Sequence, residues 1–189
     1  MKIFPLLAGI VLAVLLAGPV NAKTRMVTDP DAPRSLPAEG PVSVDWTDPA
    51  EFSEIRHSAN RWEARRGNWV VQLAEYLQTS AAKRLAPGEQ LQVTLTDISR
   101  AGDYEPWRGP NLQDARIVRD IYPPRISLTF KRTDPQGNVI AEGERKLVDS
   151  AFLMNSSTFG ASDTLRYEKR LLDDWLRKEF KPEQALSAR

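Results

Sequence analysis

The residue types best suited to binding a ligand gather in one stretch, residues 101–124, which reads AGDYEPWRGPNLQDARIVRDIYPP. Arginine guanidinium groups bind carboxylates or phosphates in a two-pronged fashion, and the flat faces of tryptophan and tyrosine stack on sugars or cations. A connection of this length is unusual inside a compact domain, where most connections have about 4–6 residues. The stretch is therefore predicted to be a binding loop. The predicted contact residues are Tyr104, Trp107, Arg108, Arg116, Arg119, Tyr122 and Arg125.

Two other interpretations of this loop stay open. Its acids and arginines could pair with one another while Trp107 plugs the end of a sheet, which would make the loop structural. Alternatively, Asp103 and Glu105 could be the acid and base of a carbohydrate-active hydrolase, because two carboxylates with separated pKa values can hydrolyse glycosides. Carboxyl groups about 5–10 Å apart across an open groove would favour the hydrolase. Tight pairing of both with arginines would count against it.

Other reactive chemistry is sparse in this sequence. His57 is the single histidine, has no identifiable Ser, Cys or Asp partner, and is predicted to be a solvated loop residue. With one histidine and no cysteine, no zinc set is identifiable, and the carboxylates lack the spacing of a calcium loop. No nucleophile elbow, Gly-rich phosphate loop or His-Glu-x-x-His pair occurs. We therefore predict no metal and no cofactor, and we favour a binding role over catalysis.

The first 22 residues are predicted to be a signal peptide. Lys2 precedes an apolar run over residues 3–20, and Val20 and Ala22 occupy the positions that a signal peptidase reads. An uncleaved anchor is the alternative, since the run is near the lower length limit of a spanning helix. Because Gly18-Pro19 would break such a helix, we expect cleavage after Ala22 and no stable membrane anchor afterwards.

The near-zero net charge excludes partners that would be attracted by a strong electrostatic field of the protein. The chain of 189 residues has 26 Lys and Arg against 25 Asp and Glu, a formal charge of +1. Loss of Lys2 with the leader would leave 25 against 25. A neutral chain does not gather nucleic acid or anionic lipid from a distance. We predict no nucleic-acid partner, and an envelope component or protein as the binding partner.

The mature chain is predicted to contain one domain between two flanking segments. Residues 23–41 hold four prolines and few large apolar side chains, which predicts a Pro-rich linker. Residues 42–180 carry the readable periodicity, and residues 181–189 lose it and are predicted to be a flexible tail. With no cysteine available for disulfides, the core of the domain must provide the stability.

The domain is predicted to be α+β, a two-layer sandwich in which two helices cover one face of a mostly antiparallel four-stranded sheet. Apolar and polar residues alternate as in half-buried strands, and other apolar residues recur at helical spacing. Asp134 to Asn138 has the Pro and Gly positions of a hairpin turn. The predicted order β-α-β-β-β-α comprises strands from residue 42 to 46, 91 to 96, 126 to 131 and 139 to 148, and helices from 62 to 85 and 165 to 180, the latter with Asp163 as N-cap.

The edges of this sheet suggest a third function, that of a scaffold or assembly protein. An edge strand without a partner offers backbone groups to another chain. The predicted edges are the first and last strands of the domain. The sequence leaves the oligomeric state open.

Several segments resemble an uncharacterised family of exported Gram-negative proteins, domain of unknown function 3016. The resemblance covers about residues 42–180 and implies a periplasmic location, without implying an activity or a catalytic residue. The segments are Thr96-Asp97-Ile98, Ala101-Gly102-Asp103, EPWRGP at 105–110, RIVRDIYPPR at 116–125, AFLM at 151–154, RYEK at 166–169 and LDDWL at 172–176.

Overall fold

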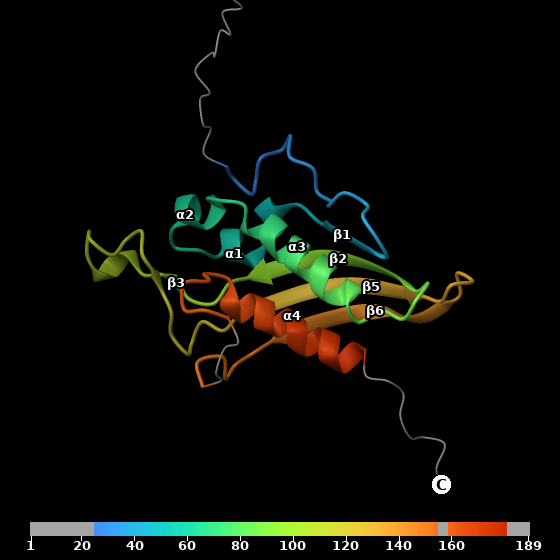
Figure 1. The fold of residues 1–189 in the computed structure, drawn as a ribbon. Helices are drawn as coiled ribbons and strands as arrows, with labels where there is room; N and C mark the ends of the chain where they lie inside the picture. Colours follow the sequence, from blue (N-terminus) through green and yellow to red (C-terminus); the bar gives the residue numbers. More distant parts are fainter. Residues whose placement is uncertain (1–24, 155–158, 181–189) are drawn as a thin grey trace, which may run out of the picture.

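The computed structural model describes residues 25–154 and 159–180, shown in colour in Figure 1. The predicted signal peptide (1–22) and tail (181–189) lie outside these residues. No helix in the described part is both long and apolar enough to span a membrane.

The centre of the fold is a four-stranded sheet in the order β1-β2-β5-β6. The strands are β1 (Val42–Trp46), β2 (Gln90–Ser99), β5 (Arg125–Thr133) and β6 (Val139–Val148). Strand β1 runs parallel to β2, whereas β2, β5 and β6 are successively antiparallel. The α+β class is confirmed, and the mostly antiparallel sheet of the prediction is in fact a mixed one. The parallel pair arises because the chain crosses over through a helix between β1 and β2.

Side-chain alternation explains where these strands form. In β1 every second residue, beginning with Val42, is buried, and the same alternation continues in β2 and β5. Val44 lies opposite Val93 in β2, which lies opposite Phe130 in β5, so one row of apolar side chains crosses the sheet. This row belongs to the hydrophobic core.

Two long helices, α3 (Trp69–Ala82) and α4 (Arg166–Glu179), complete the core. Figure 1 shows them side by side against the sheet, and the Tyr76 hydroxyl of α3 donates a 2.6 Å hydrogen bond to Asp173 of α4. The helix predicted from residue 62 is divided, because Gly67 adopts a φ of 90° between α2 (Arg61–Arg65) and α3.

The predicted cap of the last helix is wrong by two residues. Leu165 is the N-cap of α4 and makes no side-chain capping bond. Asp163 instead accepts 2.9 Å from the N–H of Leu165 and 2.7 Å from Lys169, so it stabilises the turn that precedes the helix.

The segment predicted as a Pro-rich linker is held against the domain over residues 25–41. Leu36 donates its N–H to Val44 at 3.0 Å, and Trp46 donates to Arg34 at 2.9 Å. These bonds lie along the outer edge of β1, since β2 occupies its other side. Composition predicted a spacer because it counts apolar side chains, whereas this segment is ordered by backbone hydrogen bonds to an exposed edge.

The remaining elements are short and surround one end of the sheet. After β1 come η1 (Pro49–Glu51), α1 (Ser53–Arg56) and α2. Between β2 and β5 the chain forms β3 (Asp103–Tyr104), η2 (Pro106–Arg108) and β4 (Arg116–Ile117). Figure 1 shows this second group extending away from the sheet, opposite to the β5–β6 turn.

Candidate functional site

The site is built around the extension between β2 and β5, called here the arm (residues 101–124). Strands β3 and β4 form a two-stranded ribbon with Tyr104 opposite Arg116. Gly102 has a φ of 80°, and a Cβ there would lie 2.8 Å from the carbonyl oxygen of Ile117. Only glycine fits this close approach without a shift of the backbone.

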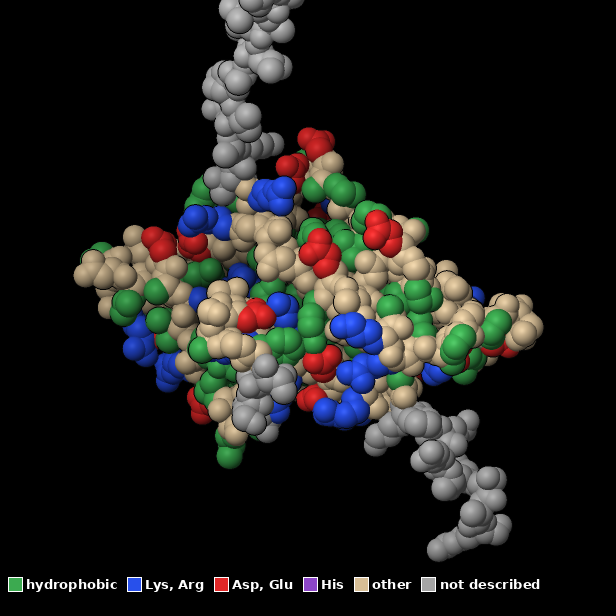
Figure 2. All heavy atoms as spheres, in the orientation of Figure 1, with side chains coloured by type: hydrophobic (Ala, Val, Ile, Leu, Met, Phe, Trp, Pro, Cys, Tyr) green, Lys and Arg blue, Asp and Glu red, His purple; other side chains and the backbone are tan. Residues whose placement is uncertain are grey.

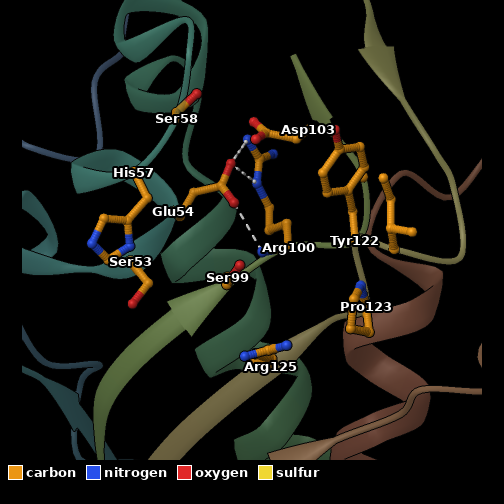
Figure 3. A pocket seen from close by; sticks show the side chains of 12 residues that line it. Ser53, Glu54, His57, Ser58, Ser99, Arg100, Asp103, Tyr122, Pro123 and Arg125 are labelled. Atoms are coloured by element: carbon orange, nitrogen blue, oxygen red, sulfur yellow. Dashed lines mark hydrogen bonds and ion pairs between the residues drawn. The ribbon is translucent and has the colours of Figure 1, made fainter. Parts of the chain in front are cut away.

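At the base of the arm, Glu54 of α1 binds the end of β2 and strand β4 of the arm. Its buried carboxylate accepts 2.8 Å from the N–H of Arg100, and 3.1 and 2.9 Å from the guanidinium of that residue. The guanidinium of Arg116 donates to the same carboxylate and, at 2.7 Å, to the carbonyl of Gly102. Figure 3 shows Glu54 and Arg100 pointing toward each other. One carboxylate therefore joins α1, the end of β2 and β4.

A second buried carboxylate, Glu168 of α4, also binds the base of the arm. It accepts 2.6 Å from the N–H of Ala101. Its other oxygen has no hydrogen-bond partner among the described residues. Burial raises the pKa of Glu168, against the lowering effect of the Ala101 bond, so the folded protein holds this proton to a higher pH than an exposed glutamate does.

A third carboxylate, Glu105, holds the arm from within. It accepts 3.1 Å from Arg119 and 3.0 Å from the hydroxyl of Tyr122, and it also pairs with Arg108. Burial by itself would raise the pKa of Glu105, but the hydrogen bonds from Arg108, Tyr122 and Arg119 together lower it. Glu105 is thus an ionised anchor with several donors.

Five of the predicted contact residues contribute to these internal contacts. Arg108, Arg119 and Tyr122 bind Glu105, and the guanidinium of Arg116 lies 4.7 Å over the buried ring of Tyr104. In these contacts the arm resembles the structural interpretation, in which its charges pair with one another. The side chains of Arg108 and Arg119 nevertheless remain 45% exposed.

The apolar side chains of the arm do not follow that interpretation. Trp107 is 69% exposed and does not plug the sheet. Residues 114–120 contain the short strand β4, and Val118 there is exposed. The exposed large apolar side chains of the arm are Trp107, Leu112, Val118 and Ile121.

A hollow of about 300 Å³ lies beside the base of the arm (Figure 3). Ser53 is fixed in its wall, because its N–H and hydroxyl both bind Asp97, at 2.6 and 2.7 Å. The predicted contact residue Arg125 is exposed at this hollow. The lining residues are Ser53, Glu54, His57, Ser58, Ser99, Arg100, Gly102, Asp103, Ile121, Tyr122, Pro123 and Arg125.

The two carboxylates of the hydrolase interpretation have different surroundings. Asp103 lines the hollow, and burial raises its pKa despite a 2.7 Å bond from the N–H of Tyr104 and the nearby charge of Arg116. Glu105 is bound by arginines and does not line the hollow. The geometry therefore does not favour these two residues as an acid and base acting on one substrate.

Sequence reasoning missed Glu54, Arg100, Glu168 and the hollow. No local motif distinguishes Glu54 from the other glutamates, because its partners lie 46 and 62 residues further along the chain. Residues 25–154 and 159–180 contain no group of three or more His, Cys, Asp or Glu side chains that could hold a metal ion.

A comparison with models of known protein families shows which family the chain belongs to. The family model described as "Protein of unknown function (DUF3016)" matches residues 40–178. The chain belongs to this family. The match covers all four strands of the sheet, the arm and nearly all of α4. No curated protein and no solved structure matches the chain.

Proposed function

We propose that this DUF3016 protein is an exported, non-enzymatic module that binds a protein of the cell envelope through its arm. The observation that carries this proposal is the contrast between two neighbours: Trp107 is 69% exposed, while Glu105, two residues earlier, is 1% exposed. The arm uses its carboxylate to hold itself in shape and leaves its largest aromatic side chain in solvent.

Such an arrangement favours binding because the entropy of ordering the arm is already lost before a partner arrives. Side-chain and loop ordering are among the main costs of association. Glu105 fixes Arg108 and Arg119 while leaving both half exposed, so each can still contact a partner. Tryptophan and arginine are the residue types that most often dominate protein–protein interfaces.

The charge distribution supports a partner recognised by contact. Figure 2 shows basic and acidic side chains interspersed over the visible face, without a large patch of one sign. A mature chain with 25 basic and 25 acidic residues has no field to steer a charged ligand. The apolar leader at residues 1–22 supports export, and hence a partner in the envelope.

Photo-crosslinking in living cells tests the proposal. A photoreactive amino acid is placed at Trp107 and, as a control, at Lys83, the exposed C-cap of α3, whose C-terminal end lies away from the arm (Figure 1). We expect a discrete protein adduct from position 107 and none from position 83. The absence of an adduct at 107, or the same adduct from both positions, would overturn the proposal.

A second variant tests whether the shape of the arm matters. Glu105→Gln retains the size of the side chain but weakens the charge-assisted bonds from Arg108 and Arg119. In the protein that carries the crosslinker at 107, this substitution should reduce the adduct several-fold. An undiminished adduct would show that binding does not depend on the braced conformation.

A further inference from the structure

Strand β6 is an edge strand with a free side. It is the last strand in the order β1-β2-β5-β6, and the described residues place no further strand beyond it. The other edge differs, because residues 34–36 bond to β1. A ten-residue edge offers backbone N–H and C=O groups to another chain.

Exposed apolar side chains concentrate at the two ends of this edge. Five of the ten exposed large apolar side chains in the described part of the protein lie in β6 or within six residues after it. Val139 and Ile140 lie at one end, Val148 at the other, and Leu153 and Met154 follow. Apolar groups flanking a free edge are typical of an interface.

The charged side chains of β6 occupy the middle of the same exposed row. From Ala141 to Leu147 the odd-numbered residues turn toward the core, where Arg145 pairs with Glu179. The even-numbered side chains are exposed. In order they are Ile140, Glu142, Glu144, Lys146 and Val148.

This row is complementary to itself when reversed. If a second copy pairs antiparallel with Glu144 opposite its own counterpart, Glu142 lies opposite Lys146 of the second copy, and Ile140 lies opposite Val148. The like charges of the two Glu144 side chains meet at the centre, where Lys146 of each chain is close, 3.5 Å from Glu144 within its own chain. In-register parallel pairing would instead place every charge opposite a like charge.

We propose that two copies of this protein pair through β6, antiparallel and centred on Glu144, to form a continuous eight-stranded sheet. Charges along an edge usually prevent strand pairing. Here the charges and the apolar ends together select this register, because a two-residue shift that sets Glu144 opposite Lys146 of the second copy leaves Val148 opposite Glu142. The partner of this surface is therefore a second copy of the chain. The arm, at the other end of the sheet from the β5–β6 turn, is not needed for the contact.

Charge reversal tests the register. Sedimentation equilibrium of the full chain should show a concentration-dependent dimer. Glu142→Lys and Lys146→Glu alone should each weaken the dimer at least about tenfold, since each creates two repulsive pairs per dimer. The double variant restores opposite charges and should recover most of the affinity. A monomer at all concentrations, or a double variant as weak as the singles, would overturn the proposal.

Cysteine crosslinking tests the centre of symmetry in a chain that has no natural cysteine. Directly opposed residues of antiparallel strands have Cα atoms about 4.5–5.5 Å apart, within the range that a disulfide spans. Glu144→Cys should therefore form a disulfide-linked dimer under mild oxidation. Glu142→Cys should not, because its counterpart is displaced four residues, about 13 Å, along the strand. Equal crosslinking of both variants, or none at position 144, contradicts the proposed register.

Discussion

The β5–β6 turn and the arm lie at opposite ends of the sheet and are ordered in opposite ways. In the turn, Asp134 accepts 2.9 and 2.8 Å hydrogen bonds from the N–H groups of Gln136 and Asn138, all within five residues. The arm depends on Glu54 and Glu168, whose bonds span 46 to 67 residues of sequence. The turn is therefore a local structure, whereas the arm exists only once the domain has folded around it.

The largest effect is expected from Glu54→Ala. This change leaves the guanidinium groups of Arg100 and Arg116 without their shared carboxylate, and removing one partner of a buried ion pair costs about 3–5 kcal/mol. Urea unfolding should show a corresponding loss of unfolding free energy.

Glu51→Ala is the matched control, three residues away. Its carboxylate lies 3.6 Å from Arg56 with both side chains well exposed, and such pairs contribute about 0–1 kcal/mol. Equal losses from Glu51→Ala and Glu54→Ala would mean that the base of the arm is no more important than an exposed ion pair.

These two regions also define what the sequence could predict. The turn at 134–138, the four strands and the long helices follow from periodicity and turn chemistry, which act over a few residues. The ion pairs that hold the arm could not be predicted, because the alternation of apolar and polar residues does not show which arginine a glutamate will bind in the folded protein. The ordered conformation of residues 25–41 could not be predicted for a similar reason, since this segment is held by hydrogen bonds to the backbone of β1.

The candidate site was predictable in part. Residue types and loop length identified the arm, and its predicted aromatic residue, Trp107, is exposed. The roles of Arg108, Arg119 and Tyr122 were not predictable, because binding a ligand and binding Glu105 require the same side chains. Chemistry locates a candidate loop, and only geometry shows which of its charges are already used.

The next largest effect should depend on pH. The pKa of Glu168 is raised by burial, so between the ordinary glutamate pKa and the raised value the folded state holds a proton that the unfolded state has lost. Its contribution to stability is therefore fully present at low pH and declines as pH rises through that window, by up to about 1.4 kcal/mol per pH unit.

Glu168→Gln imitates the protonated side chain at every pH. The variant should equal the original protein in acid and exceed it in stability near neutral pH, as measured by urea unfolding across a pH series. A variant that is less stable at neutral pH, with an unchanged pH slope, would show that Glu168 acts as a charged anchor like Glu54.

A smaller and more local effect is expected from Glu105→Gln. The partners of Glu105 all lie in the arm, so weakening these bonds should open the arm without unfolding the sheet. Hydrogen exchange should accelerate about tenfold or more at Gly102, whose N–H donates to Tyr122, while β2 amides keep their rates. Faster exchange throughout the sheet would make the arm and the core one cooperative unit.

The smallest effect should come from Asp134→Ala in the turn. The side-chain bond from Asn138 lowers the pKa of Asp134 further than burial raises it, so its contribution is present above the ordinary aspartate pKa and lost as pH falls through the lowered one. At neutral pH we expect Tm to fall by less than about 3 °C, because the hydrogen bonds are exposed. Asp134→Asn keeps an accepting oxygen, so its Tm should fall less than that of Asp134→Ala. The difference between Asp134→Ala and the original protein should vanish in strong acid, where Asp134 is protonated. A loss in Asp134→Ala as large as that in Glu54→Ala would mean that the turn supports the whole sheet, and the separation between a local and a global connection would fail.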